Sequence, residues 1–243
     1  LKNGDWPNTT LIIMDTSKFI WEPECHEGFK EIVEKEIFID KVYERYFEVE
    51  EGDVVFDVGA SLGPFTHSIL DKNPSQVFAF EPSFEEFKTL VLNTRQGPVT
   101  HINKGISNHV GQFEFEYVFD VGDNEIFYST TFQKVIKDYN IQTIDFLKSD
   151  CEGGEYDIFT KENLDWIYNN VGHIALEVHR RHSTSGPADF KRFRDDFLKF
   201  YQDKGKVQYQ HAFLAEAIWD DEAIKQESFD YLPAEFMVYF TNR

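Results

Sequence analysis

Two short stretches of the chain combine glycines with ionisable side chains, a combination suited to ligand chemistry. Residues 57–63 read DVGASLG, and residues 148–155 read KSDCEGGE. Glycine lets a backbone approach a ligand where a Cβ would clash. Clustered charges beside glycines make a poor hydrophobic core but a suitable edge for an active site. We therefore expect a bound ligand at the first stretch, and proton transfer or metal binding at the second.

The first stretch is paired with Glu81, which follows an apolar segment 18 residues after Gly63. A carboxylate at this spacing suits both hydroxyls of an adenosine ribose. The dinucleotide pattern G-x-G-x-x-G is absent, and an anionic Asp57 beside a pyrophosphate would be unfavourable. The same carboxylate suits a ligand that carries an ammonium and a sulfonium, as S-adenosylmethionine does. The alternative is that the glycines only permit tight packing of a strand against a helix.

The second stretch is expected to meet Glu177 and His179, which lie two residues apart and so share one face of a predicted strand. Parallel neighbouring strands would bring Asp150 and Glu152 to the same point. These four side chains suit two roles, a proton acceptor or a set of ligands for Mg²⁺ or Mn²⁺. Taken alone, His179 is better explained as a surface or strand-capping histidine. A buried Glu177 requires a partner.

Other chemistries have less support in the sequence. Nothing fixes a histidine and a third orienting group beside Cys151, so a small buried residue is the better interpretation. Ser61 does not lie in a G-x-S-x-G elbow, and neither H-E-x-x-H nor a P-loop occurs. The two cysteines, Cys25 and Cys151, cannot build a disulfide framework, which favours a reducing compartment and a cytoplasmic location.

The elements that must position these residues alternate between strand and helix. Strands are predicted over residues 53–57, 76–80, 99–103, 113–117, 144–148, 173–178, 206–211 and 234–240. Helices are predicted over residues 64–70, 84–91, 155–160 and 187–204. Repeated strand–helix units imply an α/β fold with a mainly parallel sheet and helices on both faces, whose ligands bind at the carboxyl ends of the strands. Residues 1–50 lack the alternation and are expected to form a small N-terminal cap.

Composition limits the partners. The 243 residues suit one large domain or a domain with an added subdomain, and the formal net charge of −20 nearly excludes nonspecific binding to nucleic acid or to anionic membranes. No apolar run is long enough to span a membrane, and the sequence begins at Leu1 rather than Met. Basic residues gather only after His179. Arg180 and Arg181 border the expected site, so we hypothesise that they attract an anionic acceptor.

Four motifs in order resemble the FkbM family of S-adenosylmethionine-dependent methyltransferases. They are residues 57–63, residues 79–82 (AFEP), residues 144–153 (IDFLKSDCEG) and residues 176–179 (LEVH). The resemblance covers residues 36–180 and implies a Rossmann-like class I methyltransferase domain over residues 51–243, with residues 234–240 as its reversed last strand. It implies an O-methyltransferase of sugar or natural-product hydroxyls. The family usually has Asn at position 61 and an aliphatic residue at position 149, where this chain has serine.

The resemblance also implies roles for individual residues. The expected cofactor-binding residues are Asp57, Gly59, Ala60, Ser61, Gly63, Glu81, Pro82, Ser107 and Asp150. The expected catalytic residues are His179, Asp150 and Glu152, and the expected acceptor-binding residues are Glu177, Arg180 and Arg181. We favour base catalysis over a divalent metal held by Asp150, Glu152, Glu177 or His179.

Several alternatives stay open. The acceptor is expected to be a sugar or glycan, although a non-sugar small molecule is also consistent with the resemblance. An NAD-dependent oxidoreductase and a non-catalytic scaffold on the same fold are further alternatives. Acceptor choice is expected to lie in residues 1–50 and 119–139. The sequence assigns neither the acceptor nor the oligomeric state.

Overall fold

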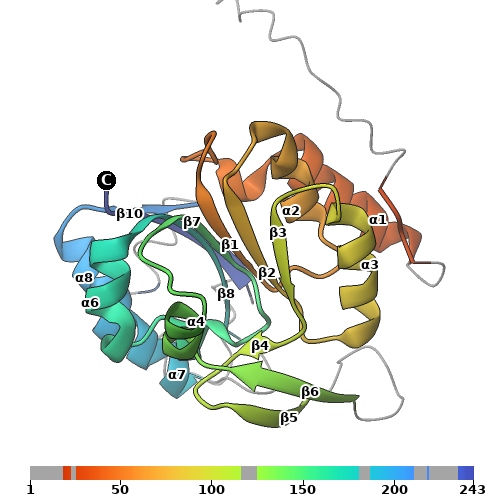
Figure 1. Ribbon diagram of the computed structural model, residues 1–243. Coiled ribbons are helices and arrows are strands. Elements are labelled where there is room, and N and C mark those ends of the chain that lie inside the picture. The colour runs from red at the N-terminus through yellow and green to blue at the C-terminus, as the bar shows by residue number, and fades with distance from the viewer. Residues whose placement is uncertain (1–18, 23–25, 116–124, 181–186, 211–217, 219–234) are drawn as a thin grey trace, which may run out of the picture.

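The computed structural model describes residues 19–22, 26–115, 125–180, 187–210, 218 and 235–243. Its centre is a seven-stranded sheet in the order β3-β2-β1-β7-β8-β10-β9 (Figure 1). The strands are β1 (Val54–Val58), β2 (Gln76–Phe80), β3 (Val99–Ile102), β7 (Ile144–Ser149), β8 (Val171–His179), β9 (Val207–Tyr209) and β10 (Glu235–Thr241). Strand β10 runs antiparallel to both of its neighbours, β8 and β9, whereas the other pairs are parallel.

The central strands are continuous apolar runs because both of their faces are covered. On β1, Val55 faces one core cluster and Phe56 the other, and both are fully buried. Helices α2 (Pro64–Ile69) and α3 (Phe84–Thr94) lie on one face. Helices on the opposite face are α4 (Phe132–Asp138), α6 (Lys161–Asn170), α7 (Pro187–Phe193), the π-helical turn η5 (Arg194–Leu198) and α8 (Lys199–Asp203). The fold class predicted from the sequence is confirmed.

The described part of residues 1–50 packs onto the first of these faces. It contains α1 (Glu27–Val33), the π-helical turn η2 (Glu34–Ile39) and the 3₁₀ turn η3 (Val42–Glu44). Ile37, Tyr43 and Val49 belong to the same core cluster as Val55 and Phe146 of the sheet. This segment therefore shares its core with the sheet that it covers.

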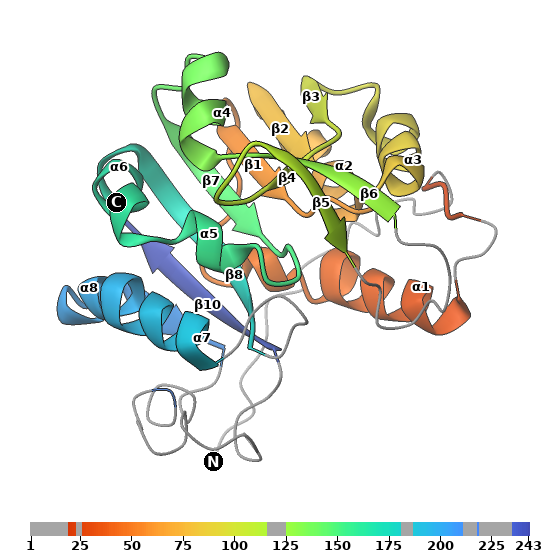
Figure 2. The same ribbon diagram turned by 90° about the horizontal axis from the view of Figure 1, so that it is seen from below.

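A second, smaller sheet lies beyond the carboxyl end of β3. It has the order β4-β6-β5 and consists of β4 (Gly105–Ile106), β5 (Gly111–Phe115) and β6 (Glu125–Thr130). Figure 2 shows this sheet and α1 on two sides of the ends of the central strands. Of this sheet the sequence predicted only β5, and it also missed α4 and α6. No helix in the described ranges has the length and hydropathy needed to cross a bilayer.

Candidate active site

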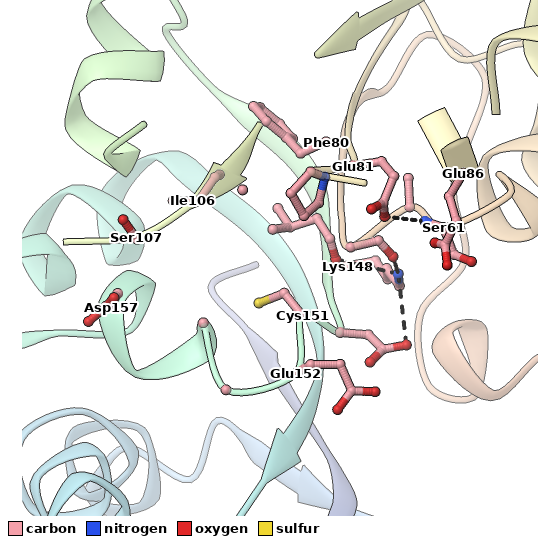
Figure 3. A pocket seen from close by; sticks show the side chains of 18 of the residues that line it. Ser61, Phe80, Glu81, Glu86, Ile106, Ser107, Lys148, Cys151, Glu152 and Asp157 are labelled. Carbon is pink, nitrogen blue, oxygen red and sulfur yellow. Dashed lines mark hydrogen bonds and ion pairs between the residues drawn. The ribbon is translucent and has the colours of Figure 1, made fainter. Parts of the chain in front are cut away.

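A cavity of about 900 Å³ opens at the carboxyl ends of β1, β2 and β7 (Figure 3). Its walls come from the β1–α2 turn, the end of β2, the loop after β7, the small sheet, α1 and η2, and α7. Of the predicted site residues, the cavity is lined by Gly59, Ala60, Ser61, Glu81, Pro82, Ser107, Asp150 and Glu152. The topology therefore gathers most of the expected residues around one space, as it does at the strand ends of open α/β sheets in general.

The turn after β1 is held rigidly against its neighbours. The amides of Gly59 and Ala60 both donate to the carbonyl oxygen of Phe80, at 3.1 and 2.9 Å. Gly59 has φ +75°, and a Cβ there would lie 1.7 Å from the carbonyl oxygen of Asp150. Only glycine fits such an approach. The turn and the loop after β7 are thus in direct backbone contact.

Glu81 is the best-defined ligand group in the cavity. Its Oε2 accepts the amide of Ser61 and its Oε1 accepts the amide of Ser83, each at 2.8 Å. Each carboxylate oxygen accepts more than one hydrogen bond, so both retain capacity for a ligand hydroxyl. The side chain is 5% exposed, and burial raises its pKa to about 8, with the nearby Glu86 adding to the effect.

Asp57 and Gly63 do not fit their predicted roles as direct ligand contacts. Asp57 is fully buried, accepts the hydroxyl of Thr66 at 2.6 Å, and lies 3.1 Å from the ammonium of Lys148. Lys148 in turn donates to the carbonyl oxygen of Gly59 at 2.5 Å. At Gly63, a Cβ would clash with Leu90 of α3. Both residues support the turn from beneath instead of lining the cavity.

Asp150 lies where the ends of β7 and β8 and the N-terminal segment meet. Its Oδ2 accepts the hydroxyl of Tyr43 at 2.6 Å, and that hydroxyl is also 3.2 Å from Oε2 of Glu177. The Oδ1 atom of Asp150 is 3.7 Å from Nε2 of His179. Burial, followed by the charge of Asp150, raises the pKa of Glu177 to about 8. Glu177 is only partly buried; it lies beside the hydroxyl of Tyr43 and does not itself line the cavity.

His179 is held by Glu155 in a way that does not fit a general base. Its Nδ1 is 2.7 Å from Oε1 of Glu155, which is fully buried on α5 (Glu155–Ile158). Burial lowers the pKa of His179, but the hydrogen bond to Glu155 and the charges of Glu155, Asp150 and Glu152 outweigh it and raise the pKa to about 10. The imidazole therefore carries an extra proton at neutral pH. In addition, His179 does not line the cavity. The predicted role of first proton acceptor is a poor match for this residue.

The four residues proposed as alternative metal ligands do come together, in two overlapping groups. Asp150, Glu152 and His179 form one group, and Glu177 and His179 form another with Glu235 of β10, with ligand atoms within 4.8 Å of one another in each. Carboxylates and an imidazole suit Mn²⁺ or a related ion, and the hydrogen bond that Nδ1 of His179 donates to Glu155 leaves Nε2 facing the other ligands. Either group could hold a divalent cation that displaces the proton from Nε2 of His179.

The predicted anion-binding arginines are not seen at the cavity. Arg180 directly follows β8, is 1% exposed and lies in the interior. Arg181 lies outside the described residues. Arg192 of α7 lines the cavity instead, 3.1 Å from Asp189. The lining carboxylates are Glu36, Glu81, Glu86, Asp150, Glu152, Asp157 and Asp189, against the two cations Lys148 and Arg192 among the described lining residues.

Sequence reasoning missed four contributors. Tyr43, Glu36 and Glu235 reach the site through tertiary packing and strand pairing, and nothing in their local sequence marks them. Glu155 lay within the stretch KSDCEGGE, yet only the fold shows that it contacts His179. Burial raises the pKa of the Cys151 thiol well above its usual range, which agrees with its interpretation as a non-nucleophilic residue.

The strand order with one reversed strand, together with an acidic glycine turn after β1 and a carboxylate after β2, defines a class I methyltransferase fold. Residues 57–207 match the family model described as the methyltransferase FkbM domain. This match covers more than half of the chain, so the chain belongs to that family. The resemblance inferred from the four sequence motifs is confirmed.

Two curated relatives are similar to parts of the chain. The hexuronic acid methyltransferase AglP of Haloferax volcanii is 28% identical over 143 residues, which cover 54% of this chain and 58% of the relative. The 31-O-demethyl-FK506 methyltransferase FkbM of Streptomyces tacrolimicus is 41% identical over 68 residues, which cover 27% of this chain and 26% of the relative. The chain thus matches less than two thirds of either relative. A solved rRNA methylase from Streptococcus thermophilus is 12% identical, with a TM-score of 0.45 and coverage of 83% of this chain and 92% of that one.

Proposed function

We propose that the protein transfers the methyl group of S-adenosylmethionine to a hydroxyl oxygen of a sugar or glycan. The observation that carries the proposal is the setting of Glu81. Its two oxygens are each held by one backbone amide, at the end of β2 and beside a glycine turn, and they face a cavity of about 900 Å³. This arrangement suits a ribose with two vicinal hydroxyls.

The rest of the cavity fits the same cofactor. Phe80, Pro82 and Ile106 offer apolar surface beside Glu81 for an adenine ring. The carboxylates of the lining favour a ligand with an ammonium and a sulfonium. When bound, S-adenosylmethionine supplies an electrophilic methyl group on a sulfonium, and the departure of that group leaves a neutral thioether. The backbone of residues 59–61 and the side chain of Glu81 would hold it.

Asp150 is the proton acceptor that the geometry favours. It lines the cavity, whereas His179 does not and already carries a proton. A sugar hydroxyl becomes a useful nucleophile only as its proton leaves, so a carboxylate near the acceptor oxygen promotes the transfer. Glu152 also lines the cavity, but its side chain is 59% exposed and therefore less constrained. The protonated His179 is hydrogen-bonded to Glu155, and its Nε2 places a positive charge 3.7 Å from Asp150.

A sugar acceptor is supported by the relative named as a hexuronic acid methyltransferase. The charge of the lining adds a refinement. Among the described lining residues, seven carboxylates against two cations favour a neutral acceptor over an anionic one, in contrast to the expectation based on Arg180 and Arg181. A natural-product hydroxyl is the second candidate, because the other curated relative is named as a methyltransferase of demethyl-FK506.

Calorimetry with S-adenosylmethionine and with NAD tests the cofactor, and only the first is expected to bind. Mass spectrometry then tests the reaction, with labelled S-adenosylmethionine and a panel of neutral glycans, uronic acid glycans, nucleotide sugars and hydroxylated natural products. A labelled methyl group on a sugar oxygen is the expected result. Binding of NAD alone, or methyl transfer only to nitrogen or carbon, would overturn the proposal.

A further inference from the structure

Tyr43 is a lining residue that comes from outside the family domain. It lies on η3, upstream of residues 57–207, which match the family model. It is nonetheless 5% exposed and contributes to the wall of the cavity. The N-terminal segment thus supplies, besides the lining residues of α1 and η2, a hydroxyl that reaches the residues after β7.

The hydroxyl of Tyr43 connects two carboxylates from adjacent strands. It donates to Oδ2 of Asp150 at 2.6 Å and lies 3.2 Å from Oε2 of Glu177. A hydroxyl has a single proton to donate, so the shorter contact is the donated hydrogen bond. The oxygen of Tyr43 also stands between two acidic groups that would otherwise face one another. Asp150 is thereby fixed at Oδ2, and its Oδ1 remains on the side of His179.

The position of this hydroxyl is itself fixed by packing. The ring of Tyr43 packs edge-on against Phe65 at a centroid distance of 5.6 Å, and the ammonium of Lys148 lies 5.2 Å from the ring centroid. The carbonyl oxygen of the preceding residue, Val42, accepts the hydroxyl of Tyr239 at 2.7 Å. A hydrogen bond from a donor held in this way to a carboxylate is among the stronger ones in proteins.

We propose that Tyr43 is a positioning residue for methyl transfer, which holds the carboxylate of Asp150 in the orientation that accepts the proton of the acceptor hydroxyl. This inference rests on the proposed function. It makes the N-terminal segment a part of the active site and not only a cover for it. If the role of Tyr43 were purely structural, only the packing of its ring would matter and its hydroxyl would not affect methyl transfer.

The test compares Tyr43→Phe with Tyr239→Phe. The first keeps the ring and removes the hydroxyl from Asp150, whereas the second removes a buried hydroxyl that anchors the same segment and touches neither carboxylate. We expect Tyr43→Phe to lower kcat about 10- to 100-fold, with the acceptor KM changed less than about threefold. Tyr239→Phe should change kcat by less than about threefold.

A double-mutant cycle separates positioning from packing. In an Asp150→Asn background, measured by single turnover, Tyr43→Phe should have little further effect, because the group that it positions no longer accepts a proton. The inference would be overturned by any of three results. They are an equal fall in kcat in the two tyrosine variants, an effect of Tyr43→Phe on KM alone, and a further fall in rate from Tyr43→Phe in the Asp150→Asn background that is as large as in the wild type.

Two controls keep the result unambiguous. Thermal unfolding checks that Tyr43→Phe folds, and if it does not, the double variant Tyr43→Phe/Glu177→Gln replaces the acidic group that faces Asp150 and still lacks the donor to Asp150. Wild-type protein that transfers no methyl group refutes the proposed function first. An active wild type with an unaffected Tyr43→Phe variant refutes the inference about Tyr43 alone.

Discussion

The cavity has two ends that are built in different ways. The end near β1 and β2, here called the backbone end, consists of a glycine turn and Glu81. Hydrogen bonds from backbone amides hold the two together. At the end near β7 and β8, here called the side-chain end, the ionisable groups are side chains contributed by η3, α5, the loop after β7 and the end of β8. Backbone contacts fix a shape that suits one invariant ligand, whereas assembled side chains set proton positions. The two ends should therefore respond differently to mutation, pH and acceptor chemistry.

The largest effect is expected at the side-chain end. Asp150→Asn keeps the size of the side chain and removes the proton acceptor, so kcat should fall about 10²- to 10⁴-fold. Binding of S-adenosylmethionine, measured by calorimetry, should change far less. Glu152→Gln is the matched control and should cost less than about tenfold. A lower kcat in Glu152→Gln than in Asp150→Asn would mean that Glu152, and not Asp150, is the proton acceptor.

Replacement of Glu81, at the backbone end, should weaken cofactor binding and leave kcat nearly unchanged. Glu81→Gln loses a charged acceptor for the ribose hydroxyls, and the Kd of S-adenosylmethionine should rise about 10- to 100-fold. At saturating cofactor, kcat should stay within about threefold of the wild type. Glu86→Gln, in the same wall of the cavity, controls for the simple loss of one negative charge. Equal Kd values for the two variants would contradict a specific role for Glu81.

Cofactor binding should depend on pH through Glu81. In the free protein its pKa is raised to about 8, whereas ribose hydroxyls donate to the ionised form. Binding below pH 8 must therefore release a proton, and affinity should fall as the pH is lowered, by roughly 25-fold between pH 8.5 and 6.5. Calorimetry in buffers of different ionisation enthalpy measures the released proton directly. The Glu81→Gln variant should show a flat profile, and a wild type as flat as this variant would rule out the linkage.

The acceptor should show a moderate preference set by charge. Because the described lining carries more carboxylates than cations, a neutral glycan should have a kcat/KM about tenfold higher than the same glycan with a uronic acid at the methylated position. Glu36→Gln removes a charge from the wall and should narrow this gap, while Glu31→Gln on α1, which does not line the cavity, should not. Equal or higher activity with the uronic acid would favour an acceptor like that of the Haloferax relative.

The smallest effect is expected from chelation. If Asp150 accepts the proton directly, dialysis against EDTA should change kcat by less than about twofold. Activity that disappears on chelation and returns only with Mg²⁺ or Mn²⁺ would mean that the carboxylates and His179 hold an ion. In that case the side-chain end would work by Lewis acidity and not by proton transfer.

The contrast between the two ends also explains what the sequence could predict. The central strands, the turn and Glu81 were predictable because apolar runs, glycines and a fixed spacing are local signals. Tyr43 and Glu235 reach the site only through packing and the antiparallel pairing in which Glu235 stands opposite His179. Arg180 was assigned to the acceptor because it follows His179, but a position along the chain does not reveal whether a side chain points inward.

The hydrogen bond from Tyr239 to Val42 has a consequence for how the protein is made. During synthesis, the turn after β1 and Glu81 leave the ribosome early and pair with neighbours close in sequence. Tyr43 emerges before either of them, yet β10, which holds its segment and lies between β8 and β9, is among the last parts to emerge. The segment that carries Tyr43 therefore completes its packing only after β10 has been synthesised, although it is one of the first described parts of the chain to be made.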